Sequence, residues 1–368
     1  MNSQKLLSIS SIGILCFCIA NNCNPKSQVE PDFNESSFES TQLLSGKGNL
    51  YNNESIELKN PRQILYHPDS FLIIQEFQTS YHITVIDLKT DSVQYLLSKG
   101  RGPHELIIAW GINIVDNEVW VFGGQLSKMC KLTVDENRVF KVSNEVIFKD
   151  KNLPTAYAIK DDLFVALSGI QTKKRLTFYN SEGEVLKTMG EFPPFINSES
   201  FDGGNNIIFL STIGAVPSIN RIILACYKTD LIEIYDIDNG LVQRIHGPKG
   251  IHIEASKVNV GPGIMIKTQP KIQAYKGSIS ANENEIWIPY LGLMPEEGEP
   301  IPETEDLLPK TIFCFDWEGF PMTMISLEIP VFSFTVDWQN DILYALTINN
   351  QNEPCIVTFD LEKDNYEI

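Results

Sequence analysis

Apolar and polar residues alternate along this chain in a pattern that returns six times. Each copy has four to six alternating residues such as Val, Ile, Phe, Tyr and Thr, followed by Asp or Asn and a short polar turn. A period of two predicts a β-strand with one buried face. The Asp or Asn side chain can bond the backbone two residues further on, so each copy is predicted to run into a tight turn. The copies are ITVIDLKTD (83–91), KLTVDENR (131–138), LTFYNSEGE (176–184), IEIYDIDNG (232–240), IFCFDWEGF (312–320) and IVTFDLEKD (356–364).

A second apolar run precedes every copy. Its first residue lies 14 to 17 residues before the closing Asp or Asn in five copies, as from Leu72 to Asp87, and 30 residues before it in the fifth, from Ile286 to Asp316. The excess lies in the Pro- and Glu-rich stretch 289–310. Further runs lie upstream, as in GINIVD (111–116), and downstream, as in SVQYLLS (92–98), which predicts four strands per unit.

Repeated units of four antiparallel strands predict an all-β fold, a six-bladed β-propeller, because closure into a ring leaves no open sheet edge. Seven blades are the alternative, since the fourth and fifth copies are widely separated. Residues 247–272 contain several Gly and Pro residues, which favours a long connection with one hairpin over a further blade. We therefore divide the chain into 1–22, 23–44 and a propeller at 45–368 with an acidic insertion at 289–310.

The N-terminus resembles a secretory signal. A short charged start precedes the apolar stretch LLSISSIGILCFCIA, which is too short to span a membrane, so residues 1–22 are predicted to be a signal peptide. Cys23 follows at the position of a lipid-modified cysteine, and residues 23–44 have the polar composition of a tether. Simple secretion with cleavage near Cys23 is the alternative. We expect a lipid-anchored protein of the cell envelope, in the periplasm or at the outer membrane.

Charge and cysteine content narrow the function classes. The formal net charge of −18 would repel nucleic-acid phosphates, so no nucleic-acid partner is expected. The remaining cysteines fall on predicted strands of different blades, which favours small buried residues over disulfides: Cys130, Cys226, Cys314 and Cys355.

The predicted connections separate onto two faces of the ring. Turns from the first to the second strand and from the third to the fourth are short, whereas second-to-third loops and blade-to-blade crossovers are long and irregular. Variable loops on a rigid frame commonly carry binding residues. We call the face that carries the long loops and crossovers the crossover face. We expect any binding site on this face, over the central channel.

One crossover carries a distinctive motif. KGRGPHEL (99–106) resembles the K-G-x-G-P-x-E-(F/L) stretch of the TolB-like six-bladed propeller lipoproteins of Bacteroidetes. The blade length, signal sequence and tether are also similar to that family, over roughly residues 45–368, whereas the 289–310 insertion departs from it. The resemblance implies a fold, a compartment and a lineage, and no particular chemistry.

The candidate ligand-binding residues lie on two crossovers: Arg101, His104, Glu105, His246 and Lys249. The first three could bind an anionic or sugar ligand, but the interpretation we favour is that Glu105 fixes the turn that Gly100 and Gly102 allow. We expect no metal, because His104 leaves blade one whereas His246 and His252 leave blade four, which is nearly opposite in the ring. The carboxylates of the 289–310 insertion could hold calcium, but they lack the spacing of a calcium loop, so a solvated acidic flap is the interpretation we favour. No cofactor is expected. The five tryptophans are expected mainly in the core, with the alternative that one or more lines the binding face.

No nucleophile elbow, phosphate loop or HExxH helix occurs in the sequence. We therefore predict a non-enzymatic binding or scaffold propeller that presents its crossover face to an envelope protein, peptide or glycan. The alternative is a hydrolase or lyase, lactonase-like or acting on polysaccharides, in the central channel. It predicts carboxylates or histidines at the starts of the first strands. A cluster of polar groups at the channel mouth would favour a small ligand, and a broad apolar patch a protein partner.

Overall fold

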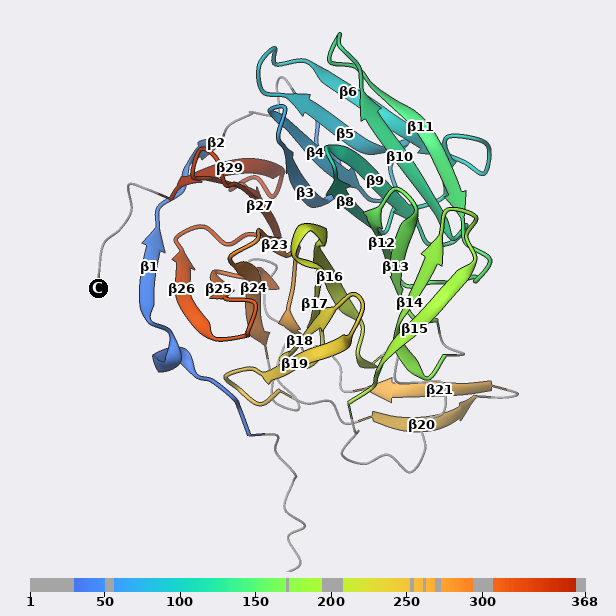
Figure 1. The fold of residues 1–368 in the computed structure, drawn as a ribbon. Helices are drawn as coiled ribbons and strands as arrows, with labels where there is room; N and C mark the ends of the chain where they lie inside the picture. Colours follow the sequence, from blue (N-terminus) through green and yellow to red (C-terminus); the bar gives the residue numbers. More distant parts are fainter. Residues whose placement is uncertain are drawn as a thin grey trace, which may run out of the picture.

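Six β-sheets surround a central channel in the computed structural model of this protein (Figure 1). The structure describes residues 30–49, 56–169, 172–193, 208–251, 255–260, 263–268, 273–293 and 307–361. The helical elements that lie wholly within these ranges are two short 3-10 turns, η1 (Glu35–Ser37) and η2 (Pro217–Ile219). The predicted all-β six-bladed propeller is therefore confirmed.

Blades one to four each contain four consecutive antiparallel strands, with the first strand of each innermost. In blade one, a short β7 (Glu105–Leu106) adds a parallel pair to the outer strand. The strands are β3 (Pro61–His67), β4 (Phe71–Glu76), β5 (Tyr81–Asp87) and β6 (Val93–Lys99) in blade one; β8 (Gly111–Val115), β9 (Glu118–Gly123), β10 (Lys128–Val134) and β11 (Phe140–Ile147) in blade two; β12 (Ala156–Lys160), β13 (Leu163–Leu167), β14 (Lys174–Asn180) and β15 (Val185–Glu191) in blade three; and β16 (Ser211–Val216), β17 (Arg221–Cys226), β18 (Leu231–Asp236) and β19 (Gly240–His246) in blade four.

Blades five and six are completed by the N-terminal segment. Strand β1 (Ser40–Leu44) pairs in parallel with β26 (Pro321–Leu327) of blade five, and β2 (Lys47–Asn49) takes the outermost position of blade six, antiparallel to β29 (Pro354–Asp360). The start and end of the propeller are thus joined in one sheet, which closes the ring. The strands are β22 (Gln273–Tyr275), β23 (Ser280–Ala281), β24 (Ile286–Leu293), β25 (Thr311–Phe315), β26 (Pro321–Leu327) and β1 (Ser40–Leu44) in blade five, and β27 (Ser333–Asp337), β28 (Ile342–Ile348), β29 (Pro354–Asp360) and β2 (Lys47–Asn49) in blade six.

Residues 30–44 contribute to the folded body, although the sequence placed them in the tether. Phe33 is 4 % exposed, and its ring lies edge-on to Phe313 and Phe315 at centroid distances of 5.6 and 5.3 Å. Leu44 is fully buried. The tether was predicted from the polar composition of the whole stretch, which does not reveal that two of its apolar residues, Phe33 and Leu44, are buried. Within the described residues, no helix is long and apolar enough to cross a membrane.

The repeated Asp or Asn forms the predicted turn in five copies. The side-chain Oδ1 atom accepts a hydrogen bond from the amide two residues further on at 2.8 to 3.1 Å. In the sixth copy, Asp360 pairs with Lys47 of the N-terminal segment at 2.9 Å. The turn residues are Asp87, Asp135, Asn180, Asp236 and Asp316.

Burial along the middle strands differs from the one-sided pattern that the alternation predicted. Every residue of β4 and nearly every residue of β5 and β18 is buried. Each blade lies between two others, so both of its faces are covered. Phe71 and Val85 of blade one, for example, share a core cluster with Val119 of blade two. The exposed residues concentrate on outer strands such as β15 and β19.

The innermost strands of neighbouring blades are bridged by side-chain hydrogen bonds. The amide group of Gln63 in β3 donates to the Ile112 carbonyl at 3.1 Å and accepts from the Ile112 amide at 3.2 Å. Asn113 bonds both backbone groups of Ala158 in the same way. These bonds satisfy backbone groups that face the channel and fix the positions of its walls.

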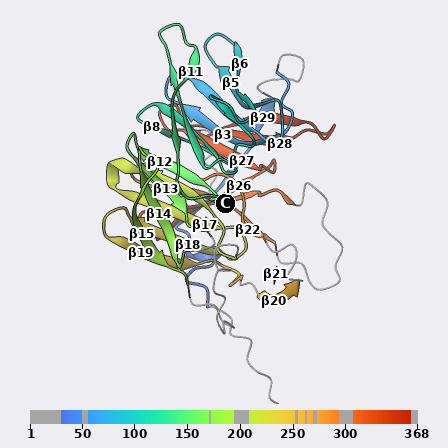
Figure 2. The same ribbon diagram turned by 90° about the vertical axis from the view of Figure 1, so that its right-hand side faces the viewer.

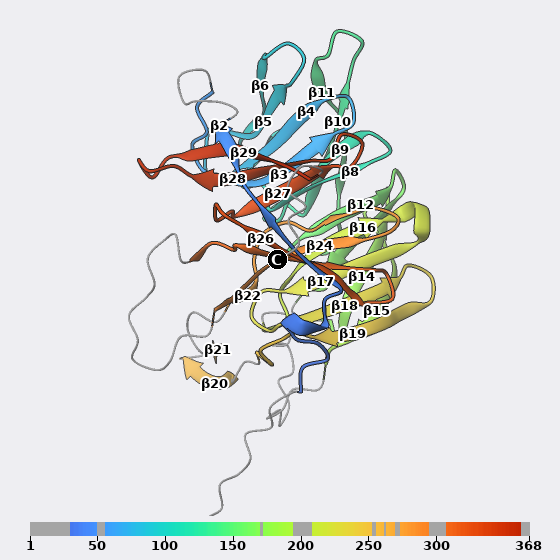
Figure 3. The ribbon, with the colours of Figure 1, turned by 90° about the vertical axis from the view of Figure 1, so that its left-hand side faces the viewer.

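The long connection after blade four contains one hairpin, β20 (Ala255–Val260) and β21 (Gly263–Thr268), as predicted. Figures 2 and 3 show it outside the ring of blades, so it does not form a seventh blade. Residues 294–306 of the acidic insertion lie outside the described residues. The four cysteines on strands are buried and free, and they belong to blades two, four, five and six.

Candidate functional site

A pocket of about 640 Å³ lies at the mouth of the central channel. Its walls are the starts of first strands and the residues that follow second strands, which places it on the crossover face. The position agrees with the sequence-based expectation of a site over the channel on this face. All six blades contribute: Arg62, Gln63, Gln75, Phe77, Trp110, Gly124, Gln125, Asn152, Leu153, Pro154, Thr155, Tyr157, Leu210, Ser211, Thr212, Ile213, Tyr227, Lys276, Gly277, Ser278 and Phe332.

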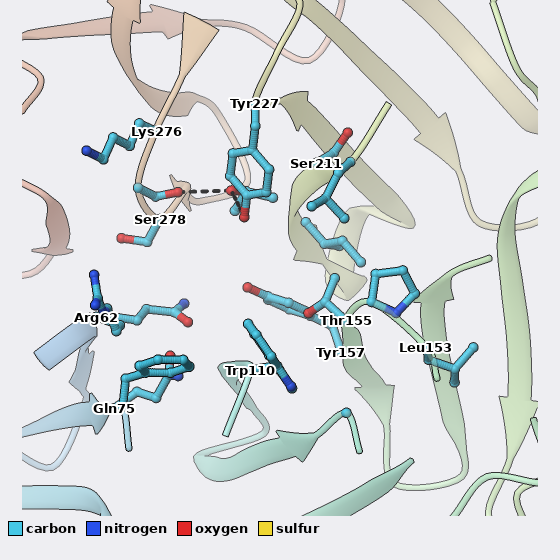
Figure 4. A pocket seen from close by; sticks show the side chains of 18 of the residues that line it. Arg62, Gln75, Trp110, Leu153, Thr155, Tyr157, Ser211, Tyr227, Lys276 and Ser278 are labelled. Atoms are coloured by element: carbon cyan, nitrogen blue, oxygen red, sulfur yellow. Dashed lines mark hydrogen bonds between the residues drawn. The ribbon is translucent and has the colours of Figure 1, made fainter. Parts of the chain in front are cut away.

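Two cationic side chains lie on the same side of the pocket (Figure 4). Arg62 is exposed at the start of β3, and Lys276 is half-buried in the segment before β23. Burial, and then the charge of Arg62, lowers the pKa of Lys276 below its usual value. The two cations therefore repel each other on this side of the pocket.

Aromatic rings form another part of the wall. Trp110 precedes β8, is 46 % exposed, and meets Phe77 edge-on at a centroid distance of 5.6 Å. A Cβ on Gly124 would lie 2.5 Å from Trp110 Cδ1, so only glycine lets the indole lie this close to the backbone. An exposed aromatic ring held in this way offers a flat face to a ligand ring.

The deeper wall is made of hydroxyl and amide groups with defined partners. Gln75 donates to the Ala109 carbonyl at 2.6 Å, and the Thr212 hydroxyl donates to the Gly277 carbonyl at 3.0 Å and lies 3.1 Å from Tyr227 Oη. Burial raises the pKa of Tyr157 and Tyr227, so both phenols keep their proton over the physiological range. The pocket thus presents neutral polar groups beside the two cations.

A buried ionic network supports this wall from behind. Arg175 of blade three, 2 % exposed, donates to Glu233 of blade four at 2.6 Å, to the Phe209 carbonyl at 2.6 Å and to Ser211 Oγ at 2.9 Å. Arg244 donates to the other oxygen of Glu233 at 2.9 Å. Because Ser211 lines the pocket, the network connects the wall to two blades.

The motif on the first crossover has a structural role at the periphery. Glu105 accepts a hydrogen bond from the Gly102 amide at 2.8 Å, and a Cβ on Gly100 would lie 1.9 Å from the same carboxylate oxygen. This confirms the interpretation that Glu105 fixes the turn. His104 is exposed and its amide donates to Glu145 at 2.6 Å, while Arg101 is exposed.

His246 and Lys249 meet at a different junction, between blades four and five. The His246 amide donates to Asp32 at 2.7 Å, and burial lowers the pKa of its imidazole. The amide of Lys249 donates to Asp230 at 3.1 Å, and its Nζ donates to the Gly292 carbonyl at 2.8 Å. The structure thus separates the five predicted residues into two groups, neither of which lines the channel pocket.

The histidines that were considered as metal ligands and lie in the described part of the chain, His104 and His246, belong to separate junctions. No group of three or more His, Cys, Asp or Glu side chains in that part of the chain is positioned to hold an ion. His252 and most of the acidic insertion lie outside the described residues.

Sequence reasoning missed Arg62 and Lys276 and considered Trp110 only as one of five tryptophans. The usable signal was positional: a polar or aromatic residue at the start of a first strand or just after a second strand points to the channel mouth. Trp110 fits this rule, whereas Trp120, Trp287 and Trp317 lie within blades and are buried.

Comparisons with known proteins agree with the fold. A structure from Bacteroides vulgatus, a member of the DUF4221 family, matches with a TM-score of 0.53 and 12 % identity over 86 % of this chain and 97 % of its own. A Bacteroides fragilis protein that is named as exported matches with a TM-score of 0.50 and 12 % identity over 89 % of this chain and 96 % of its own. No curated protein matches.

The sequence profile of the TolB-like 6-blade propeller-like family matches residues 32–339, which is most of the chain. The match begins just before the N-terminal segment that completes blades five and six, and it ends in blade six. The chain therefore belongs to the TolB-like 6-blade propeller-like family.

Proposed function

We propose that this protein is a binding propeller that takes a small ligand, or the end of a glycan or peptide chain, into the channel-mouth pocket. The observation that carries the proposal is the convergence of polar side chains from five of the six blades on one pocket of about 640 Å³, which Phe332 of the sixth blade also lines. This volume lies in the ordinary range for small-molecule sites, roughly 300 to 1,000 Å³. A cluster of polar groups of this kind favours a small ligand over a broad protein interface.

The alternative of a hydrolase or lyase receives no comparable support. It predicted carboxylates or histidines at the starts of the first strands, whereas the lining residues in the described ranges include no Asp, Glu or His. General acid–base catalysis relies mainly on such side chains. Binding is thus the function that this geometry supports better.

A pocket-filling variant tests the proposal. Gln125 is exposed at the pocket, so Gln125→Trp should fill the opening without disturbing the core. Gln339→Trp, at an exposed turn on the opposite face, is the matched control. Ligand-observed NMR with a panel of sugars, sugar acids and dipeptides should give hits that Gln125→Trp abolishes and Gln339→Trp retains. Hits that survive in Gln125→Trp, or a panel without hits, would contradict the proposal.

The cellular setting that we propose is the cell envelope, with lipid anchoring at Cys23. Two observations support this setting: residues 1–22 resemble a secretory signal, and the structurally similar B. fragilis protein is named as exported. Mass spectrometry of the N-terminal peptide from membrane fractions should find an acylated Cys23. Cys23→Ala should release the protein from the membrane, whereas an unmodified cysteine in the wild-type protein would refute the anchor.

A further inference from the structure

The cations of the channel-mouth pocket have an unusual electrostatic setting. The whole chain has a formal net charge of −18, yet the described residues that line the pocket include two cations and no carboxylate. Two like charges at one site oppose each other, and burial adds to the cost at Lys276. A bound anion would relieve both effects.

The donors of these cations are largely available. Among the described residues, Arg62 makes no hydrogen bond or ion pair, and its guanidinium lies 5.3 Å from the centre of the Phe77 ring. Lys276 donates from Nζ to the Leu307 carbonyl at 2.5 Å, which leaves two further N–H groups. A guanidinium fork beside an ammonium suits the two oxygens of a carboxylate.

From these observations we propose that the pocket binds a small carboxylic acid that contains a ring, with its carboxylate between Arg62 and Lys276 and its ring against Trp110. This inference deepens the proposed function and rests on it. The exposed indole supplies a flat apolar face, and the neutral groups of Tyr157 and Gln75 offer partners to hydroxyl substituents. The ring has two sources, a sugar acid or an aromatic acid, which the test distinguishes.

Isothermal titration calorimetry with matched pairs of an acid and a neutral counterpart tests the inference. The sugar pair is sodium D-glucuronate and D-glucose, and the aromatic pair is sodium phenylacetate and benzyl alcohol. Charged hydrogen bonds of this kind change affinity by about ten- to a hundred-fold. We expect at least one acid to bind about ten-fold more tightly than its neutral counterpart, and the pair in which this occurs identifies the ring.

Variants then assign the effect to the two cations. Arg62→Gln and Lys276→Gln should each weaken binding of the acid about ten-fold and leave the neutral partner unchanged. Arg101→Gln, at an exposed arginine on the first crossover outside the pocket, should change neither. If a variant fails to fold, the wild-type protein still tests the inference, because added NaCl should lower its affinity for the acid and leave its affinity for the neutral partner unchanged.

The outcomes separate the inference from the proposed function. Equal binding of acid and neutral partner, or an acid that binds independently of Arg62, Lys276 and salt, overturns the inference. If the two acids do not bind but other panel compounds bind and are lost in Gln125→Trp, the inference is wrong and the proposed function stands. If no compound binds, both fail.

Discussion

Removing the buried charge of Glu233 should strongly destabilise the junction of blades three and four. Glu233 is fully buried and accepts hydrogen bonds from both Arg175 and Arg244. Glu233→Gln keeps the shape and one acceptor oxygen but leaves Arg175, with 2 % of its side chain exposed, without a counter-charge. Breaking a buried ion pair in this way typically costs about 3–5 kcal/mol.

The retained contacts of Arg175 set the expected value within that range. Its bonds to the Phe209 carbonyl and to Ser211 still solvate the guanidinium, and the glutamine oxygen remains an acceptor. We therefore expect the free energy of unfolding, measured by urea titration, to fall by about 3 kcal/mol. The exposed pair of Lys149 and Glu184 provides the control, since Glu184→Gln should leave stability unchanged within error.

A double-mutant cycle tests the physical reason for this loss. Arg175→Met alone should also destabilise, because it leaves the charge of Glu233 buried with Arg244 as its remaining cationic partner. The double variant with Glu233→Gln should cost less than the sum of the two, by about 2 kcal/mol, since neither buried charge is then left. A cost below about 1 kcal/mol for Glu233→Gln, or additive single effects, would refute the reasoning.

Three further predictions concern the N-terminal segment and two buried carboxyls. Phe33→Ala should lower the unfolding free energy by about 3 kcal/mol in urea, whereas a tether that made no contacts would tolerate it. The Arg138 guanidinium lowers the pKa of Asp87 to about 2, so this pair should contribute about 2 kcal/mol that is present above about pH 4 and lost as the pH falls towards 2; the corresponding part of the acid sensitivity should be missing in Asp87→Asn. Burial raises the pKa of Asp230 to about 6, so its ionisation opposes folding increasingly as the pH rises from about 4, and fully above about 6. Asp230→Asn should therefore melt at a higher temperature than the wild type at pH 8 and at nearly the same temperature at pH 4, and equal melting of the two proteins at both pH values would contradict this.

The sequence contained enough information for the frame of the fold. Alternation located the middle strands of every blade, and the Asp or Asn at their ends formed the expected turn in five copies. These features are local, since a strand and its turn depend on residues a few positions apart. The same reasoning about loop lengths also identified the correct face for the pocket.

The N-terminal segment shows what local patterns could not provide. Strand β1 has no clear alternation, and its position depends on a parallel pairing with β26 almost three hundred residues away. Phe33 likewise gains its burial from Phe313 and Phe315 of blade five. Partners this distant in the sequence define the ends of the propeller. Local sequence patterns carry no information about such partners.

The pocket was beyond sequence reasoning for a related reason. Each blade contributes only a few lining residues, and Arg62 and Lys276 are isolated in the sequence and adjacent only in the closed ring. The motif around Glu105 was conspicuous because its residues are consecutive, yet it closes a turn at the periphery. A conspicuous motif was therefore a poorer guide than position on the blade.

The most direct test of the account is a crystal structure of the protein soaked with the acid that binds most tightly in the titrations. We expect the ligand in the channel-mouth pocket, with its carboxylate between Arg62 and Lys276 and its ring against Trp110. Ligand density at another surface, with the pocket empty, would contradict it.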